Sequence, residues 1–453
     1  MKIKDILILG AGATGISTAW NLRNYNSEII IVDREIELGG LSRTLKVDGF
    51  HMDIGPHRFF TNNSSLLRVI KNLPGVRLLE VRRLTKFYIK GKYFLYPARI
   101  RDVISNLSFA DILRIIYDYI SGQTRQIFFL RKIENLQDYL VLKFGRSLAR
   151  MNMINYSEKI WGISCSEISA DWAKERINGL SALNLIKNIF NNPGHLKTLR
   201  DVFYYPDDGI GSICNGFIKD INLIKNCIIR NQTRPVRISH DGEKITRIYL
   251  EDSRQKISEI NPDIVVSSIP INELLALFNP KPPDDILECL TKLRFRSTVC
   301  LFLIVDKQSV SLNQWIYFPD KEIPFARVSE PRNFSCRMSP EKMTSLIVEF
   351  FCWENDKVWL LNKHDLLNYS LSWLERLNLV KKEQIKDIFL HKERSSYPVY
   401  DLGYKIHLNK IQDYLSRYKN LYVCGRRGAF LYNNLDDALE DGIRISQNIK
   451  EYS

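Results

Sequence analysis

The chain has 453 residues, of which 45% are hydrophobic and 26% are charged, and this length suits about three domains or one large composite. Its formal net charge of +14 favours anionic ligands, but the basic residues are spread out and form no nucleic-acid-binding module, which excludes nucleic acid as the expected partner. Eight cysteines without a Cys-x-x-Cys pair or a Cys/His cluster argue against a structural metal and for reduced thiols in a cytoplasmic setting.

The N-terminal segment has the pattern of a strand, a glycine-rich turn, a helix and a second strand. An apolar run at residues 6–9 leads into the glycine-rich segment 10–15, and a second apolar run at 29–32 ends on an acid. In dinucleotide-binding units such glycines allow a tight turn, close approach to a pyrophosphate and close helix packing, while the acid binds ribose hydroxyls. The cofactor-binding residues predicted from this segment are Gly10, Gly12, Ala13, Thr14, Gly15 and Asp33.

A second glycine step follows the acid. Gly39 and Gly40 permit another close approach of the backbone to a ligand, and Arg43 could contact a phosphate. A nicotinamide enzyme does not need this step, whereas enzymes that bind FAD in a Rossmann-like domain commonly have it. The chain resembles those enzymes here, which adds these cofactor-binding candidates: Arg34, Gly39, Gly40, Leu41, Ser42 and Arg43.

The middle of the chain changes from strand-like to helix-like spacing. Residues 76–98 form apolar runs around a turn at 90–92, which predicts antiparallel strands of a second domain. Residues 100–192 have apolar side chains at helical spacing, which predicts a mostly helical insertion. The densest basic stretch, residues 77–101, is interpreted mainly as a solvated face, with peripheral contact to anionic membrane lipid or to a lipid-linked sugar as the alternative.

The rest of the chain is predicted to alternate between strands and helices. Strand-rich segments are expected at residues 227–230, 236–239, 245–250, 263–270, 294–352 and 421–424. Helices are expected after a loop at 205–211, near 365–377 and over 436–449. No apolar run approaches the length of a membrane span.

Together these segments predict an α/β fold whose nucleotide-binding domain is assembled from separated pieces. We expect a Rossmann-like FAD-binding domain to comprise residues 1–75, 206–290 and 395–453. An antiparallel sheet that forms a substrate domain is expected from residues 76–99 and 291–394. A helical insertion domain is expected from residues 100–205.

Several short blocks resemble the FAD-dependent amine-oxidase and protoporphyrinogen-oxidase-like superfamily. The two glycine steps and the acid between them are blocks of that superfamily as a whole. Three other blocks look most like UDP-galactopyranose mutase and its relatives, namely residues 53–57, 156–162 and 425–436. The chain departs from the mutases at Pro56, where a second glycine is common, and at residues 437–438, where a His-Ser pair is common.

The resemblance implies roles for residues that lie far apart in the sequence. His57 would lie beside the flavin and Arg327 beside the substrate, which makes these two the candidate catalytic residues. Val236, Gly425 and Asp436 would complete the FAD site. Arginines and tyrosines would hold the substrate diphosphate, and aromatic rings would lie near the uracil base. The substrate-binding residues implied are Tyr156, Trp161, Arg327, Tyr397, Arg426, Tyr432 and Asn433.

Plain structural explanations remain open for several of these residues. His57 could be an ordinary hydrogen-bonded histidine. Tyr156 and Trp161 could pack inside a helical core. Arg327 could form a surface ion pair, and Tyr397 could be a packed ring.

The resemblance implies an FAD-dependent enzyme that interconverts the pyranose and furanose forms of a nucleotide-diphosphate sugar for surface polysaccharide biosynthesis. In such enzymes N5 of reduced FAD attacks the anomeric carbon. The alternatives are an FAD-dependent oxidoreductase, such as an oxidase or desaturase, and a flavin-fold binding protein with a decayed active site. The expected partners are a nucleotide sugar or another anionic small molecule, and NAD(P)H or a reductase as electron source, without metal or a transmembrane segment.

Overall fold

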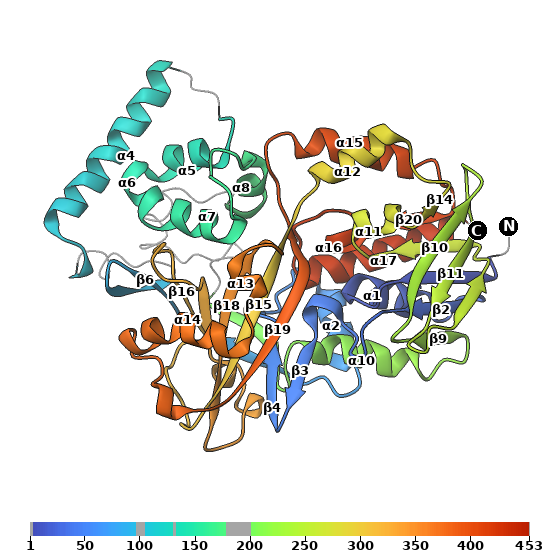
Figure 1. Ribbon diagram of the computed structural model, residues 1–453, viewed down its shortest axis with the longest axis horizontal. Coiled ribbons are helices and arrows are strands. Elements are labelled where there is room, and N and C mark those ends of the chain that lie inside the picture. The colour runs from blue at the N-terminus through green and yellow to red at the C-terminus, as the bar shows by residue number, and fades with distance from the viewer. Residues whose placement is uncertain (1–2, 97–104, 130–132, 178–200, 453) are drawn as a thin grey trace.

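The structure is a computed structural model that describes residues 3–96, 105–129, 133–177 and 201–452 (Figure 1). One of its two large sheets is parallel and five-stranded, in the order β20-β13-β1-β2-β9. The strands are β1 (Asp5–Leu9), β2 (Glu28–Val32), β9 (Cys227–Arg230), β13 (Ile264–Ser267) and β20 (Leu421–Val423). The predicted apolar runs 6–9 and 29–32 are its central strands, and they are buried because both faces of the sheet are covered.

Helices cover one face of the parallel sheet, and a smaller sheet with further helices covers the other. Ile6, Ile8 and Ile31 pack against α1 (Ala13–Leu22), α10 (Gly211–Ile221) and α17 (Leu435–Tyr452). Leu7, Leu9 and Val32 face the other layer. That layer consists of β10 (Arg234–His240), β11 (Ile245–Glu251), β12 (Ile257–Ile260), β14 (Phe278–Asn279), α11 (Ile271–Ala276), α12 (Asp284–Lys292) and α15 (Tyr404–Leu415).

The second large sheet has seven strands in the order β19-β15-β18-β17-β16-β6-β7. Its neighbours are antiparallel except for β16 and β6, which are parallel. The strands are β6 (Thr85–Ile89), β7 (Lys92–Tyr96), β15 (Phe295–Val305), β16 (Trp315–Tyr317), β17 (Arg327–Ser329), β18 (Thr344–Cys352) and β19 (Ile385–Pro398). The short helix α13 (Lys357–Leu360) and the predicted helix near 365–377, which is α14 (Lys363–Arg376), pack on this sheet.

The structure differs from the sequence analysis at three strands. The sequence pattern does not predict β19, because charged residues interrupt its alternation of apolar and polar side chains. This strand also crosses residue 395, where the sequence analysis expects a segment of the FAD-binding domain to begin. The predicted strand near residue 78 is β5 (Leu78–Arg82), but it pairs with β8 (Val202–Pro206) in a separate two-stranded sheet. β8 therefore follows the helical pattern predicted over 100–192, lies at the end of the range 100–205 expected for the insertion domain, and extends into the predicted loop at 205–211.

A group of helices lies at one end of the molecule, in the upper left of Figure 1. It consists of α4 (Phe109–Phe129), α5 (Leu136–Phe144), α6 (Arg146–Leu148), α7 (Asn155–Trp161) and α8 (Ala170–Ile177). These elements confirm the helical pattern of the middle segment as far as the structure describes it. The parts of that prediction at residues 100–104, 130–132 and 178–192 lie outside the described residues.

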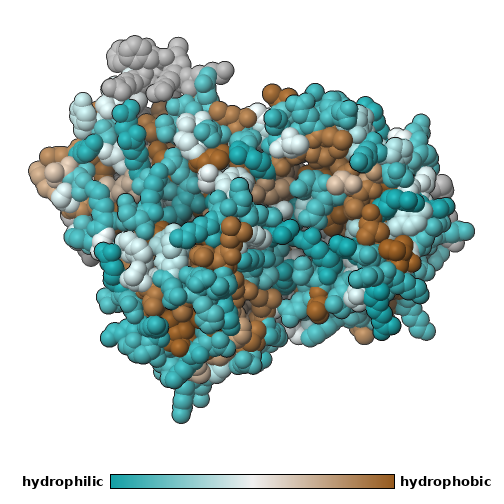
Figure 2. Space-filling view, in the orientation of Figure 1, coloured by the Kyte–Doolittle hydropathy of each residue, from teal (hydrophilic) through white to brown (hydrophobic). Residues whose placement is uncertain are grey.

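The remaining elements connect these parts. They are the hairpin of β3 (Thr44–Val47) and β4 (Phe50–Asp53), the helix α2 (Ser64–Asn72) and the short helix α16 (Gly425–Gly428). None of the described helices has the length and apolarity needed to cross a membrane. Figure 2 shows a mostly hydrophilic face on which hydrophobic side chains form scattered patches.

Candidate functional site

A cavity of about 570 Å³ is lined by residues of the parallel-sheet domain and of the seven-stranded sheet. Its wall begins at the turns after β1 and β2 and reaches β16, β17 and the segment after β20. Most residues predicted to bind a cofactor or substrate come together in this lining. They are Gly10, Gly12, Ala13, Thr14, Asp33, Arg34, Gly39, Gly40, Leu41, Ser42, Arg43, His57, Arg327, Tyr397, Gly425, Arg426, Tyr432 and Asn433.

The glycine turn after β1 has the geometry that its spacing predicts. Gly10 has a positive φ of 99°, which a residue with a side chain rarely adopts. A Cβ on Gly15 would lie far closer than 3.0 Å to the carbonyl oxygen of Gly10, so only glycine lets α1 pack against the turn. A Cβ on Gly12 would meet no protein atom within 4 Å, which leaves this backbone open toward the cavity.

The carboxylate of Asp33 is fixed at the edge of the cavity by backbone donors. The N–H of Ala11 donates to Oδ2 at 2.7 Å, and the N–H of Glu35 donates to Oδ1 at 2.9 Å. These bonds hold the acid beside the glycine turn. Each carboxylate oxygen can accept more than one bond, so Asp33 can still accept from a ligand hydroxyl.

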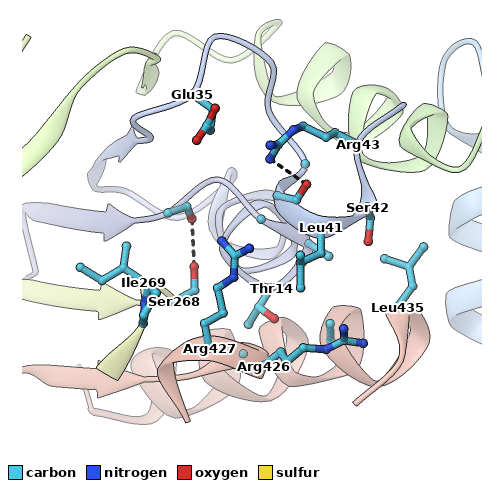
Figure 3. A pocket seen from close by; sticks show the side chains of 18 of the residues that line it. Thr14, Glu35, Leu41, Ser42, Arg43, Ser268, Ile269, Arg426, Arg427 and Leu435 are labelled. Carbon is cyan, nitrogen blue, oxygen red and sulfur yellow. Dashed lines mark hydrogen bonds between the residues drawn. The ribbon is translucent and has the colours of Figure 1, made fainter. Parts of the chain in front are cut away.

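The second glycine step packs back against the first. The N–H of Gly39 donates to the carbonyl of Ala11 at 2.8 Å, and a Cβ on Gly40 would lie 3.1 Å from Cα of Gly12. Arg43 closes this step with a bond from Nη1 to the carbonyl of Gly40 at 3.1 Å, which Figure 3 shows. The two steps therefore form one continuous backbone surface along the cavity.

Arg43 also belongs to a buried ion cluster around Glu393, a residue that the sequence analysis does not single out. Nη2 of Arg43 lies 2.8 Å from Oε2 of Glu393, Arg427 of α16 binds Oε1, and Nε2 of His391 lies 2.9 Å from Oε2. Burial alone would raise the pKa of the Glu393 carboxyl, but Arg427, His391 and Arg43 together hold it well below its usual range. The cluster joins β19 to the parallel-sheet side of the cavity.

Two arginines and two tyrosines meet at the opposite end of the cavity. Arg327 on β17 binds Glu349 on β18 through two parallel bonds, with Nε to Oε2 at 2.7 Å. The guanidinium of Arg426 lies 5.0 Å from the ring centroid of Tyr397 and 5.7 Å from that of Tyr432. These two rings stack at 5.5 Å. The arrangement combines fixed positive charge with a flat aromatic surface.

His57 lies in the same part of the lining and is half-buried. Its Nε2–H can donate to the carbonyl of Ile54, 3.1 Å away. Burial and the positive charges of Arg426 and Arg327 lower the pKa of His57 to about 4, even though bonds to backbone carbonyls oppose the shift. The ring is therefore neutral at physiological pH, and with Nε2 protonated its Nδ1 is an acceptor.

Five predicted site residues do not line the cavity: Gly15, Tyr156, Trp161, Val236 and Asp436. Gly15 acts through packing. The indole of Trp161 is buried behind the lining, with its ring 5.5 Å from Tyr432, and Tyr156 packs edge-on against Tyr317 at 5.2 Å.

Val236 is half-buried on β10, and its neighbour Pro235 lines the cavity instead. Asp436 is buried in the first turn of α17, while the preceding Leu435 lines the cavity.

Other lining residues are absent from the sequence prediction. Trp315 and Tyr317 are two residues apart on β16, so both side chains lie on the face of the strand that lines the cavity. This spacing was the only local sign in the sequence that the two residues share a site. Arg58 directly follows His57 and also lines the cavity. Arg427 lies beside Arg426 on α16, and Figure 3 shows both side chains extending from that helix.

Comparisons with known proteins show the family to which the chain belongs. Residues 13–450 match the family described as flavin containing amine oxidoreductase. The UDP-galactopyranose mutase of Mycoplasma genitalium is 42% identical over 71 residues, which cover 15% of this chain and 17% of that protein. Matches to the first curated relatives cover about a fifth of their length or less.

Two solved structures have a similar fold over almost the whole chain. A crystal structure of reduced UDP-galactopyranose mutase has a TM-score of 0.84 at 22% identity and covers 100% of this chain and 95% of that one. A putative protoporphyrinogen oxidase from Exiguobacterium sp. 255-15 has a TM-score of 0.75 at 18% identity and covers 99% of both chains. Because the family match spans residues 13–450, the chain belongs to the flavin containing amine oxidoreductase family and is an FAD-dependent enzyme.

Proposed function

We propose that this enzyme interconverts the pyranose and furanose forms of a nucleotide-diphosphate sugar, as its resemblance to UDP-galactopyranose mutase implies, and that it serves surface polysaccharide biosynthesis. The observation that carries the proposal is the meeting of Arg327, Arg426, Tyr397 and Tyr432 at one end of the cavity. Two guanidinium groups near one another suit a diphosphate, because charge-assisted bonds from both can fix its position. An oxidase of an uncharged substrate would not need this pair.

The other end of the cavity fits the cofactor of the family. The open backbone at Gly12 and the start of α1, a helix of 10 residues, offer N–H groups for a pyrophosphate. Asp33 and the segment 39–43 would hold the rest of the nucleotide part. FAD supplies, when bound and reduced, a nucleophilic nitrogen for the anomeric carbon of the sugar.

The protein residues would bind, orient and electrostatically stabilise the substrate. Glu349 fixes the Arg327 guanidinium through Nε and Nη2, which leaves Nη1 for a phosphate oxygen. Arg426 is oriented by the backbone carbonyls of Ser396 and Asn433. Positive charge held at the diphosphate stabilises the negative charge that develops when this group leaves the sugar. His57, neutral at physiological pH, adds no charge.

A binding measurement on the reduced enzyme tests this proposal. We expect Arg426→Ala to raise the Kd for UDP-galactose roughly 10- to 100-fold, because a charge-assisted bond is lost, while the flavin absorption spectrum stays unchanged. Arg394→Ala removes an exposed arginine outside the cavity and is the control, with an unchanged Kd. Unchanged affinity in Arg426→Ala, or no conversion of UDP-galactopyranose by the dithionite-reduced enzyme, would contradict the proposal.

An FAD-dependent oxidoreductase is the second candidate. Glu349 neutralises Arg327, so this end of the cavity carries less net positive charge than two arginines alone would give. The aromatic lining also suits an uncharged planar substrate. Turnover of an electron donor by the oxidised enzyme, together with no conversion of any nucleotide sugar by the reduced enzyme, would favour this candidate over the mutase.

A further inference from the structure

Arg58 differs from the other arginines that line the cavity. Among the described residues, seven arginines line the cavity, and five of them have a carboxylate partner: Arg34 with Glu273, Arg43 and Arg427 with Glu393, Arg234 with Glu251, and Arg327 with Glu349. A sixth, Arg426, is bound by backbone carbonyls. Within the described residues, Arg58 is half-buried and has neither an ion pair nor a side-chain hydrogen bond. A partly buried charge without a counter-charge is costly, so an anion that reaches it gains binding energy.

A second arginine, Arg83, lies near Arg58. Arg83 is buried, 8% exposed, and its guanidinium lies 4.9 Å from the ring centroid of Tyr96. Burial lowers the pKa of Arg83, and the charge of Arg58 lowers it further, while Tyr96 and Asp201 act in the opposite direction. The two guanidinium groups are therefore close enough to repel each other. An anion placed beside Arg58 would relieve that repulsion.

Aromatic rings pack next to these arginines, and one of them, Tyr317, lines the cavity. Tyr96 packs edge-on against Tyr317, with ring centroids 5.9 Å apart, and Phe87 stacks on Tyr317 at 4.8 Å. Strand register produces this row, because β16 pairs Tyr317 with Phe87 on one side and with Arg327 on the other. A ligand that crosses Tyr317 would therefore pass from the charged group at Arg327 toward Arg58. These apolar rings exclude water and so strengthen a charge pair formed beside them.

We propose that Arg58, supported by Arg83, forms a second anion-binding subsite, and that the substrate is a nucleotide-diphosphate sugar whose sugar carries a carboxylate. This inference rests on the proposed function and narrows its substrate class. The anionic group is assigned to the sugar because Arg58 follows directly on His57, the residue expected beside the flavin where the sugar reacts. A carboxylate matches a guanidinium in shape and can accept two parallel bonds.

Titration calorimetry with two matched ligands tests the subsite. UDP-galacturonate and UDP-galactose differ only in the sugar carboxylate, and each is titrated into the reduced holoenzyme. The wild type should bind the acidic sugar nucleotide roughly 10- to 100-fold more tightly, the size of one charge-assisted bond. Arg58→Gln should lose this preference, and Arg58→Lys should keep part of it because the charge remains.

Arg82→Gln is the matched control. Arg82 is the last residue of β5 and directly precedes Arg83, but it is exposed and lies outside the cavity lining, so its loss removes the same net charge without touching the subsite. This variant should keep the wild-type preference. A flavin spectrum that matches the wild type checks that each variant is folded.

The outcomes separate this inference from the proposed function. Equal affinity of the wild type for both ligands, or an unchanged preference in Arg58→Gln, would overturn the carboxylate subsite and leave the mutase proposal standing. No binding of either nucleotide sugar would overturn both. Tight binding of inorganic phosphate that Arg58→Gln abolishes, without discrimination between the two sugars, would show a general phosphate site and overturn the assignment to a sugar carboxylate.

Discussion

The protonation state of His57 is decided by its surroundings. Its pKa is about 4 in the folded protein, because of burial and of the charges of Arg426 and Arg327, against the usual value of 6.5. Between these two pH values the unfolded chain binds a proton that the folded protein does not. Folding therefore becomes less favourable as the pH falls through this window.

The pH dependence of stability tests this state of His57. We expect the free energy of unfolding to fall by at most about 3 kcal/mol between pH 6.5 and pH 4 because of this residue, and by less since the ring is partly exposed. Urea unfolding of the wild type and of His57→Gln measures the effect as the difference between their two pH profiles. His364→Gln, which changes an exposed histidine, is the control. A constant difference across this window would show that His57 is not shifted.

At the scale of elements, substitutions at two glycines of the segment between β1 and α1 should have different effects, one on stability and the other on FAD binding. Gly15→Ala places a Cβ against the carbonyl oxygen of Gly10, so we expect it to lower the free energy of unfolding of the apoprotein by roughly 3 kcal/mol. Gly12→Ala places its Cβ in open space and should leave the stability of the apoprotein nearly unchanged. Because Gly12 lines the cavity, that Cβ should still reduce the amount of FAD retained.

Thermal unfolding of the two apoproteins and the flavin-to-protein absorbance ratio of the purified proteins separate these effects. The expected pattern is a lower Tm in Gly15→Ala and a lower FAD content at unchanged Tm in Gly12→Ala. Full FAD retention in Gly12→Ala would contradict the assignment of the pyrophosphate to this turn.

The loop between β16 and β17 is held by one side chain of the helical group. Nζ of Lys159 on α7 lies 2.6–3.2 Å from four carbonyl oxygens, which share its three N–H donors and belong to Phe318, Asp320, Ile323 and Phe325. The loop joins Tyr317 to Arg327, both of which line the cavity. Lys159 therefore couples the helical group to the position of Arg327.

Lys159→Met should release this loop. We expect a loss of about 2–4 kcal/mol in the free energy of unfolding, because buried carbonyls lose their donor, and a weaker affinity for nucleotide sugars. Lys321→Met removes an exposed lysine of the same loop and should change neither value. Urea unfolding and ligand titration measure the two effects. Equal stability of Lys159→Met and the wild type would show that the loop does not depend on this lysine.

The elements also show what the sequence could predict. The glycine turn and the central strands follow from local patterns, so their positions and burial agree with the prediction. β19 could not be found in this way, because the charge of Glu393 is compensated by arginines from two distant segments. Trp161 illustrates the same limit, since no local pattern shows that Tyr397 and Tyr432 lie between its ring and the cavity.

At the scale of the whole molecule, the cavity exists only because distant parts of the chain are held together. One end is made by the turns of the parallel sheet and the other by β16, β17 and the residues after β20. Glu393 lies at this junction. It belongs to the seven-stranded sheet, and it binds Arg43 of the second glycine step and Arg427 of α16. A buried charge cluster thus joins the two halves. Arg43 and Glu393 are far apart in the sequence, so they pair only when the complete fold has formed.

Glu393→Gln should therefore weaken the whole assembly. Removing the carboxylate leaves two largely buried arginines without a counter-charge, and we expect the free energy of unfolding to fall by about 3–5 kcal/mol. FAD retention should fall as well, because Arg43 and Arg427 both line the cavity. Urea unfolding and flavin absorbance measure these two changes.

The control and the pH dependence make this prediction specific. Glu354→Gln removes an exposed carboxylate that pairs with an exposed arginine and should change stability by less than about 0.5 kcal/mol. The folded-state pKa of Glu393 lies well below its usual range, so its stabilisation is complete above the ordinary glutamate pKa and is lost only as the pH falls toward the lowered value. The difference between the wild type and Glu393→Gln should therefore persist undiminished from pH 7 to about pH 5. A difference that vanished within that range, or equal stability of the two proteins at pH 7, would show that the arginines do not depend on this carboxylate.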